Sequence, residues 1–392
     1  MAEKMRDGII KRGRTWSYVV REKDPVTGKS KPRWVGGFET RAAAKAERDN
    51  ARHAINRGTY VPPQDLTVAA WLDRWLAGHE VELKPSTVHA YRAQVERYLK
   101  PAIGSERLQQ LSPSRLSVVW RELHERGGQG GRPVSQRTVE FARAVLRKSF
   151  EDALVERLIQ VNPVTGSKLP KRKGKPRHTT WTGAQLASFL EHVDGDRWLP
   201  LWHLAAATGM RRGELCGLRW QHVDLDAGVI AVEVSTTQVG RERVTTTPKN
   251  HERRKVAIDV HTVAMLRAWR KAQAGERLAM GPAYADVEGL VFTWPDGAPM
   301  LPDYVTKAFP KLQAALVARL AAVDQPALPR LVVHELRHTH ATLLLRDGVP
   351  VHIVAKRLGH KDPSVTLNVY ADVIPDDDTS AVDTFSRAVW GA

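Results

Sequence analysis

Apolar and polar residues alternate in the first part of the chain, which is the pattern of half-buried β-strands. Residues 16–20 and 32–35 are rich in aromatic and β-branched side chains, and residues 24–28 supply a turn between them. An Ala-rich segment follows at 40–57, and Thr40 is suited to cap a helix there. We therefore expect a small sheet with one helix in residues 1–62, ended by two consecutive prolines.

Between residues 67 and 160 the apolar residues recur three and four positions apart, as in helices that bury one face. Four segments show this spacing: 68–77, 86–99, 113–124 and 135–158. The next segment contains three prolines and two glycines, which prevent a stable helix. The pattern predicts an all-helical domain over residues 63–161 and a linker over residues 162–177.

From residue 178 onward, helical patterns alternate with a few short strand-like segments. Residues 229–234 predict a strand, and residues 244–247 and 254–258 predict a hairpin. The last helical segment, 380–389, places Val382, Phe385 and Val389 on one face. The expected fold class is therefore multidomain α+β. A small sheet plus helix comes first, then an all-helical domain, then a mostly helical domain (178–392) with a small antiparallel sheet and a tail helix.

The amino-acid composition indicates which class of molecule the chain binds. The chain has 392 residues, 42% of them hydrophobic, which allows two or three domains with packed cores. The formal net charge of +17 at pH 7 indicates a polyanionic partner. Lys and Arg exceed Asp and Glu mainly in residues 1–63 and 162–177, whereas the two balance over 178–392. This segregation favours a binding surface over a uniformly solubilising one.

The sequence also bears on the expected compartment. Cys216 is the one cysteine, so no intrachain disulfide can form and a reducing cytoplasm is expected. The first residues lack the apolar core of a signal peptide. The longest apolar stretch, 199–207, is interrupted by Pro200 and His203 and is too short to span a bilayer. We expect a cytoplasmic, nucleoid-associated protein that does not bind a membrane.

The chemistry-bearing residues gather between Val333 and Tyr370. His334 and Arg337 are three residues apart, so a helix places them on one face. His360 follows Gly359, which is suited to end a helix, and Tyr370 comes ten residues later. Arg and His side chains suit a phosphate oxyanion, and Tyr supplies a hydroxyl nucleophile.

A zinc site is the competing interpretation of this stretch, because His334, Glu335 and His338 fit the His-Glu-x-x-His pattern. Such a site needs a third protein ligand. Where the long form of the motif requires Gly and His, the chain has Ala341 and Leu344, and no Glu follows Glu335. We therefore expect no metal and no other cofactor.

Taken together, these residues resemble the tyrosine recombinases, the phage-type integrases. Upstream, the segment Ala-Thr-Gly-Met-Arg-Arg-Gly-Glu-Leu at 207–215 resembles the first box of the family, and Thr-Pro-Lys at 247–249 precedes a basic strand where the family places a catalytic Lys. The resemblance implies six catalytic residues, with Tyr370 as the nucleophile: Arg211, Lys249, His334, Arg337, His360 and Tyr370.

The resemblance also implies a reaction, transesterification on DNA. Tyr370 attacks a backbone phosphorus and displaces the 5′-hydroxyl, leaving a 3′-phosphotyrosine bond that conserves energy without ATP. Arg211 and Arg337 stabilise the developing charge, and Lys249 protonates the leaving oxygen. His334 accepts the Tyr370 proton or orients the phosphate.

The other histidines receive lesser roles. His360 is expected to donate to a phosphate oxygen. His338 and His340 are expected to be core or supporting residues rather than catalytic ones.

The N-terminal regions carry the resemblance further. Residues 1–62 resemble an arm-binding domain, a three-stranded sheet laid on DNA, and residues 63–161 resemble the core-binding domain. Basic residues of both regions and of the linker are the candidates for DNA contact: Arg12, Arg14, Arg21, Lys29, Lys31, Arg33, Lys84, Arg92, Arg137, Arg143, Lys171, Arg172, Lys173 and Lys175.

The implied function is site-specific recombination that integrates or excises a mobile element such as a prophage. The implied partners are double-stranded DNA with core-type and arm-type sites, three further copies of the chain, and accessory DNA-bending or directionality factors. A type IB topoisomerase has a similar site, but the basic N-terminal region favours an integrase. A non-catalytic DNA-binding protein is the alternative of another class, and the full residue set argues against it.

Overall fold

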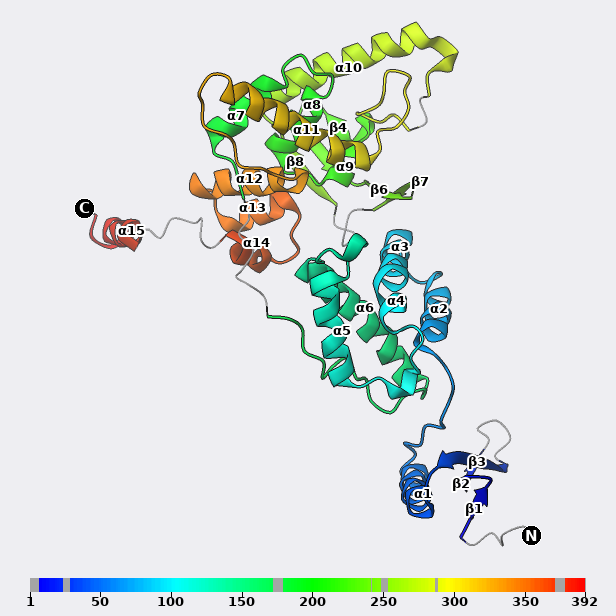
Figure 1. The fold of residues 1–392 in the computed structure, drawn as a ribbon. Helices are drawn as coiled ribbons and strands as arrows, with labels where there is room; N and C mark the ends of the chain where they lie inside the picture. Colours follow the sequence, from blue (N-terminus) through cyan, green and yellow to red (C-terminus); the bar gives the residue numbers. More distant parts are fainter. Residues whose placement is uncertain are drawn as a thin grey trace. The chain divides into compact units, whose positions relative to one another are not determined.

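The computed structural model describes residues 7–23, 29–171, 179–240, 242–247, 253–285, 288–370 and 378–391. The chain divides into two compact units, Met1–Lys175 and Pro176–Ala392, whose elements are shown in Figure 1. Helices predominate in both units, and the strands form small antiparallel sheets. The predicted fold class, multidomain α+β, is therefore confirmed.

The first unit begins with a three-stranded antiparallel sheet of β1 (Ile9–Arg12), β2 (Thr15–Lys23) and β3 (Ser30–Phe38). Helix α1 (Arg41–Asn56) packs on it (Figure 1). The hydroxyl of Thr40 accepts a hydrogen bond from the backbone N–H of Ala43, so the predicted cap is present. The predicted turn at 24–28 lies outside the described residues.

The rest of the first unit is helical. Its elements are α2 (Val68–His79), α3 (Pro85–Gln94), the π-helical turn η1 (Val95–Leu99), α4 (Lys100–Ile103), η2 (Leu108–Gln110), α5 (Pro113–Arg126), η3 (Gln129–Gly131) and α6 (Gln136–Val155). The segment predicted as one helix at 86–99 thus widens into a π turn and continues into α4. Pro101 follows that turn, and it cannot donate to the carbonyl four residues earlier.

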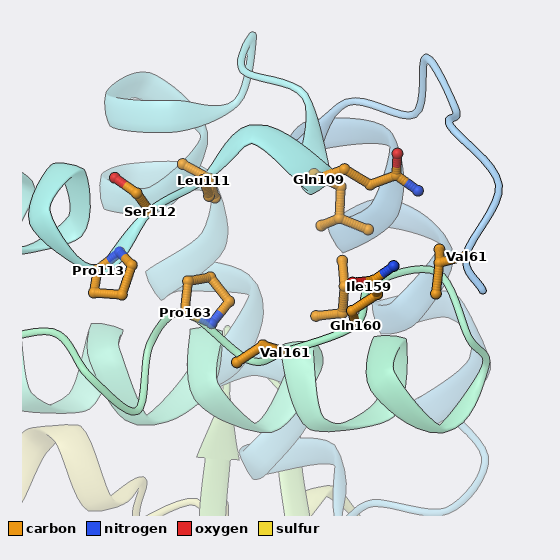
Figure 2. Close-up of a pocket in the computed structure, with 10 residues that line it drawn as sticks. Val61, Gln109, Leu111, Ser112, Pro113, Ile159, Gln160, Val161 and Pro163 are labelled. Atoms are coloured by element: carbon orange, nitrogen blue, oxygen red, sulfur yellow. The ribbon is translucent and has the colours of Figure 1, made fainter. Parts of the chain in front are cut away.

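Tryptophans on α2 and α5 anchor the core of this helical part. Trp71 donates from its indole nitrogen to the carbonyl of Ser149 at 3.1 Å, which joins α2 to α6. A pocket of about 430 Å³ lies on the same part of the chain (Figure 2). Leu111, Pro113, Ile159 and Pro163 are among the residues that line it.

The second unit holds the motifs of the predicted site. Its helices are α7 (Gly183–His192), α8 (Leu199–Thr208), α9 (Arg212–Cys216), η4 (Trp220–His222), α10 (Val260–Met280), η6 (Gly281–Ala283), α11 (Pro302–Ala321), α12 (Val333–Arg346), α13 (Val351–Leu358), α14 (Pro363–Tyr370) and α15 (Asp378–Trp390). Its strands are β4 (Val223–Asp224), β5 (Val229–Val232), β6 (Ser235–Val239), β7 (Glu242–Thr246) and β8 (Arg254–Ala257).

The hairpin predicted between 244–247 and 254–258 is wrong. Strand β7 pairs with β6 in a separate two-stranded sheet, and β8 pairs with β5 in the sheet β4-β5-β8. Gly240, with a φ of +61°, allows the tight turn that pairs Val239 with Glu242. The polar sequence of β6 has no apolar alternation and therefore carries no strand signal.

A ring of aromatic side chains fills the centre of the second unit. Trp181, Phe189, Trp202 and Phe309 are buried and contact one another, which joins α7, α8 and α11. Helix α12 packs against α8, and α13 packs against both α12 and α14 (Figure 1). No helix among the described residues is long and apolar enough to cross a membrane.

Candidate active site

Arg337 on α12 joins the ends of two other helices. It is 3% exposed, and it donates from Nη1 to the carbonyl of Gly209 at 2.8 Å and from Nη2 to the carbonyl of Leu358 at 2.6 Å. These carbonyls lie at the C-terminal ends of α8 and α13, where helix carbonyls lack intrahelical partners and carry partial negative charge. The guanidinium therefore fixes the relative positions of all three helices.

Two glycines make that convergence sterically feasible. Gly209 and Gly359 end α8 and α13 with φ values of +62° and +70°, in the left-handed region that favours glycine. A Cβ on Gly209 would lie 2.8 Å from Cδ2 of Leu358, closer than carbon atoms pack. The close approach of α8 to α13, and hence the position of Arg337, requires glycine at 209.

Glu214 on α9 holds two further arginines, Arg211 and Arg254. Its buried carboxylate accepts from the backbone N–H and Nη1 of Arg211, both at 2.8 Å. It also accepts from Arg254 of β8, at 3.0 and 2.7 Å. Burial alone would raise the pKa of Glu214, but these two cations outweigh burial and lower it. Arg211 also donates to the carbonyl of Gly359 at 3.3 Å, and its side chain stays 25% exposed.

His360 contacts Arg337 through a defined ring nitrogen. Nη2 of Arg337 lies 2.9 Å from Nε2 of His360, and Nδ1 of His360 lies 2.7 Å from the hydroxyl of Thr366. A guanidinium can only donate, so Nε2 accepts and the ring proton sits on Nδ1. Burial, together with Arg337, lowers the pKa of His360 to about 4, in agreement with a neutral ring. In this arrangement both nitrogens are engaged by protein groups.

Tyr370 ends α14 with its ring buried among Leu345, Val354 and Leu358. The side chain is 2% exposed, and its hydroxyl lies 2.5 Å from Nδ1 of His338. Burial raises the pKa of Tyr370 to about 12, an effect that the nearby charge of Arg337 partly opposes. A phenol with this pKa stays protonated at neutral pH.

Three motifs far apart in sequence thus meet at one place. The segment after α8 supplies Arg211, α12 supplies Arg337, and the stretch from α13 to α14 supplies His360 and Tyr370. The N-terminal turn of α12 supplies His334, which is exposed and whose ring meets that of His338 edge-on at 5.1 Å between centroids.

Comparisons with known proteins agree with this arrangement. The profile of the phage integrase family matches residues 182–376, which contain every one of these residues. A SAM-like N-terminal domain of phage integrases matches residues 67–120, and an arm DNA-binding domain matches residues 9–54. The chain belongs to the phage integrase family of tyrosine recombinases.

Full-length relatives support the family assignment. The chain is 28% identical to a XerC-like tyrosine recombinase of Caldanaerobacter subterraneus, over 89% of this chain and 90% of that protein. Its fold is similar to that of the Tn1549 transposon integrase in complex with a circular intermediate DNA, with a TM-score of 0.68 and 22% identity over 83% of this chain and 100% of that one. It is also similar to a lambda integrase tetramer bound to a Holliday junction, with a TM-score of 0.56 and 17% identity over 94% and 96% of the two chains.

The integrase motif also accounts for the His-Glu-x-x-His pattern. Glu335 accepts a hydrogen bond from the backbone N–H of Val332 at 2.6 Å and so caps the start of α12. Nδ1 of His338 faces the Tyr370 hydroxyl. Within the described parts of the chain, no three His, Cys, Asp or Glu side chains form a group that could hold a metal ion.

A basic pocket of about 600 Å³ adjoins this cluster at Gly359 and His360. The residues that line it include Arg253, next to β8, Lys255 on β8, Lys356 on α13, and His360 and Lys361 after α13. Its charge suits the phosphates that flank a scissile bond. Lys249, the predicted general acid, lies outside the described residues.

The candidate DNA contacts differ in their surroundings. Arg143 is held by the carbonyl of Val164 at 3.1 Å, and Arg92 pairs with Glu80, so each has a partner within the protein. Arg33 donates to the carbonyl of Pro63 at 2.7 Å. Seven others are exposed: Arg12, Arg14, Arg21, Lys29, Lys31, Lys84 and Arg137. Lys171 is exposed too, whereas Arg172, Lys173 and Lys175 lie outside the described residues.

The contact of one residue with Tyr370 was not predicted from the sequence. His338 was expected to be a core or supporting residue, yet its ring nitrogen contacts the hydroxyl of the predicted nucleophile. The signal available in the sequence was its position, one turn after His334 and next to Arg337 on the same helix. The sequence could not show that α14 returns Tyr370 to this part of α12.

Proposed function

We propose that this site-specific DNA recombinase cleaves and rejoins DNA strands at the cluster around Arg337, with Tyr370 as the nucleophile. The observation that carries the proposal is the convergence of Arg211, Arg337, His360 and Tyr370 from three separate segments of the second unit. Attack on a phosphodiester requires a nucleophile and fixed positive charge near the phosphate oxygens. This cluster brings a hydroxyl group and fixed cations close together.

In the proposed reaction the Tyr370 oxygen forms a bond to phosphorus and the bond from phosphorus to the 5′ oxygen breaks. The phenol loses its proton, and the leaving 5′ oxygen gains one from a general acid, which the resemblance assigns to Lys249. The 3′-phosphotyrosine then exchanges its Tyr370 oxygen for the 5′-hydroxyl of another strand. The second step reverses the first, so no ATP or other cofactor is consumed.

The cations have distinct places in this scheme. Arg337 is buried and bonded to helix carbonyls, so its charge is fixed before the substrate arrives. Arg211 is partly exposed and can meet a nonbridging oxygen directly. His334 stands exposed at the start of α12, where it can orient the phosphate. For His360 to donate to a phosphate oxygen, its Nε2 has to release Arg337 and also gain a proton, because the ring proton lies on Nδ1 in this arrangement.

The remaining regions supply the DNA contacts in this proposal. Residues 1–62 act as the arm-type DNA-binding domain, residues 63–161 as the core-binding domain, residues 162–177 as a basic linker, and residues 178–392 as the catalytic domain. The exposed basic residues of the first sheet and of the helical domain would contact phosphates. Double-stranded DNA would then be held on two types of site, so that distant sites are bridged.

Assembly on DNA is proposed to involve four copies of the chain, as in the lambda integrase tetramer bound to a Holliday junction. Helix α15 offers a coupling element because Val382, Phe385 and Val389 are 58%, 63% and 49% exposed. Docking of this apolar face on a neighbouring protomer would bury it. Accessory factors that bend DNA or set direction would complete the reaction, which we place at the nucleoid in the cytoplasm.

The test begins with the natural substrate. Sequencing the junctions that flank the gene identifies the attachment site, and purified protein is incubated with that DNA carrying a nick next to the scissile phosphate. Covalent protein–DNA adducts and recombinant junctions are expected. Relaxation of supercoiled plasmid without recombination would favour a topoisomerase, and binding without adducts would favour a non-catalytic DNA-binding protein.

A further inference from the structure

The nucleophile has one described contact that the proposed mechanism does not use. The hydroxyl of Tyr370 lies 2.5 Å from Nδ1 of His338, and their ring centroids lie 5.6 Å apart. The phenol is a donor at neutral pH, because burial raises its pKa to about 12. Nδ1 therefore accepts, and the proton of the neutral imidazole sits on Nε2.

Two other imidazoles of this region, those of His360 and His340, already have protein partners at both ring nitrogens. His360 accepts from Arg337 at Nε2, so it cannot take a further proton there without losing that bond. His340 accepts from Nε of Arg357 at 3.0 Å and donates from Nδ1 to the carbonyl of Ala206 at 2.8 Å. Burial lowers the pKa of His340 to about 4. Neither ring is placed to serve the nucleophile.

We propose that His338 is the general base that removes the Tyr370 proton, which is one of the two alternative roles that the resemblance implied for His334. As the Tyr370 oxygen bonds to phosphorus, its O–H bond breaks and the proton passes to Nδ1 of His338. The 5′ oxygen leaves with its electron pair and is protonated by the separate general acid. In the rejoining step His338 returns the proton to the departing Tyr370 oxygen, so charge and protons balance over the cycle.

The burial of Tyr370 explains why its hydroxyl needs a general base. A phenol whose pKa burial has raised is a weak nucleophile until its proton is removed. Two adjacent residues of α12 then have different roles. Arg337 holds a positive charge in a fixed position, and His338 accepts the proton. The inference rests on the proposed function, since it concerns the same site.

Substrates with a 5′-bridging sulfur distinguish base from acid. Sulfur leaves without protonation, so a variant that lacks the general acid recovers on this substrate, whereas a variant that lacks the base does not. His338→Asn keeps a hydrogen-bonding atom near the position of Nδ1 but cannot accept the proton. His261→Asn on α10 is the matched control, and Lys249→Ala tests the predicted acid.

Single-turnover cleavage is measured on oxygen and sulfur substrates, with DNA binding and thermal unfolding measured in parallel. His338→Asn is expected to cleave both substrates about 100-fold or more slowly, with DNA binding unchanged. Replacing Tyr370 by a fluorinated tyrosine of lower phenol pKa should restore part of that loss, a rescue that a purely structural defect would not show. If His338→Asn unfolds, His338→Gln is measured in its place.

Two results would overturn the inference: cleavage of the oxygen substrate by His338→Asn at close to the normal rate, or recovery on the sulfur substrate alone. The first means that His338 takes no proton, and the second means that it acts as the acid. A wrong proposed function would give a different result from a wrong assignment of His338. In that case the unmodified protein and His261→Asn would form no adduct on either substrate.

Discussion

Arg337 donates to Nε2 of His360 at 2.9 Å, and this contact fixes the tautomer of the histidine. The imidazole must carry its proton on Nδ1, where the hydroxyl of Thr366 accepts it at 2.7 Å. Arg337, His360 and Thr366 therefore form a directional chain from α12 to α14. Because α14 also ends in Tyr370, this chain links the buried cation to the helix that carries the proposed nucleophile.

Thr366→Val tests that chain. The side chain is fully buried and keeps its shape in the variant, but the acceptor for His360 is lost. One hydrogen bond is worth about 1.4 kcal/mol, so we expect strand cleavage to slow about tenfold with DNA binding unchanged. Single-turnover cleavage of a nicked substrate measures the effect, and Thr366→Ser should restore the rate. Equal rates for the Val variant and the original protein would remove Thr366 from the account.

Glu214→Gln tests the carboxylate that holds Arg211 and Arg254. Removing a buried charge leaves its partners uncompensated, so we expect the free energy of unfolding to fall by about 3 kcal/mol at pH 7. Urea unfolding measures it, and Glu233→Gln, at a more exposed carboxylate, serves as the control. A loss no larger than that of the control would mean that Glu214 does not hold the two arginines.

The pH dependence of the same carboxylate follows from its lowered pKa. The folded pKa lies below the ordinary value of 4.5, so ionised Glu214 stabilises the fold above that pH. This contribution should be lost as the pH falls from about 4.5 through the folded pKa. The stability difference between the original protein and Glu214→Gln should therefore shrink on acidification. A difference that stays constant between pH 7 and pH 3 would contradict the assigned direction.

Elements with a strong periodicity of apolar residues were predicted from the sequence, whereas elements with a weak periodicity were not. The spacing of His334 and Arg337 indicated one helix face, and α12 confirms it. The helix α11, which contains Pro310, was not predicted, and the polar strand β6 went unrecognised, so β7 was paired with the wrong partner. The contact of His338 with Tyr370 depends on how α14 packs against its neighbours, which no local pattern reports.

Deleting residues 1–62 tests the division of labour between regions. All six predicted catalytic residues lie beyond residue 178, so cleavage at the core site should persist in the truncated protein. Binding to distal arm-type sites should be lost, and recombination of full-length sites should fall. Gel-shift and recombination assays on the same DNA measure these effects. Recombination at the original rate would contradict the bridging role of the N-terminal region.

Substitutions on the exposed apolar face of α15 should cause a defect in assembly on DNA. Each buried apolar side chain contributes about 1.5–3 kcal/mol, so Phe385→Ser combined with Val389→Ser should weaken synapsis while single-site DNA binding stays near normal. Native gels measure synaptic complexes and Holliday junctions, with Ser386→Ala as the control on the same helix. Normal synapsis in the double variant would show that α15 does not couple protomers.

The most direct test of the account is the formation of a covalent adduct at Tyr370. The protein is incubated in excess EDTA with a nicked substrate carrying its attachment site, and the adduct is digested and sequenced by mass spectrometry. The account predicts a DNA 3′-phosphate linked to Tyr370 without any added metal, and no adduct for Tyr370→Phe, which keeps the buried ring. An adduct in Tyr370→Phe, or cleavage that stops in EDTA and returns with zinc, would contradict it.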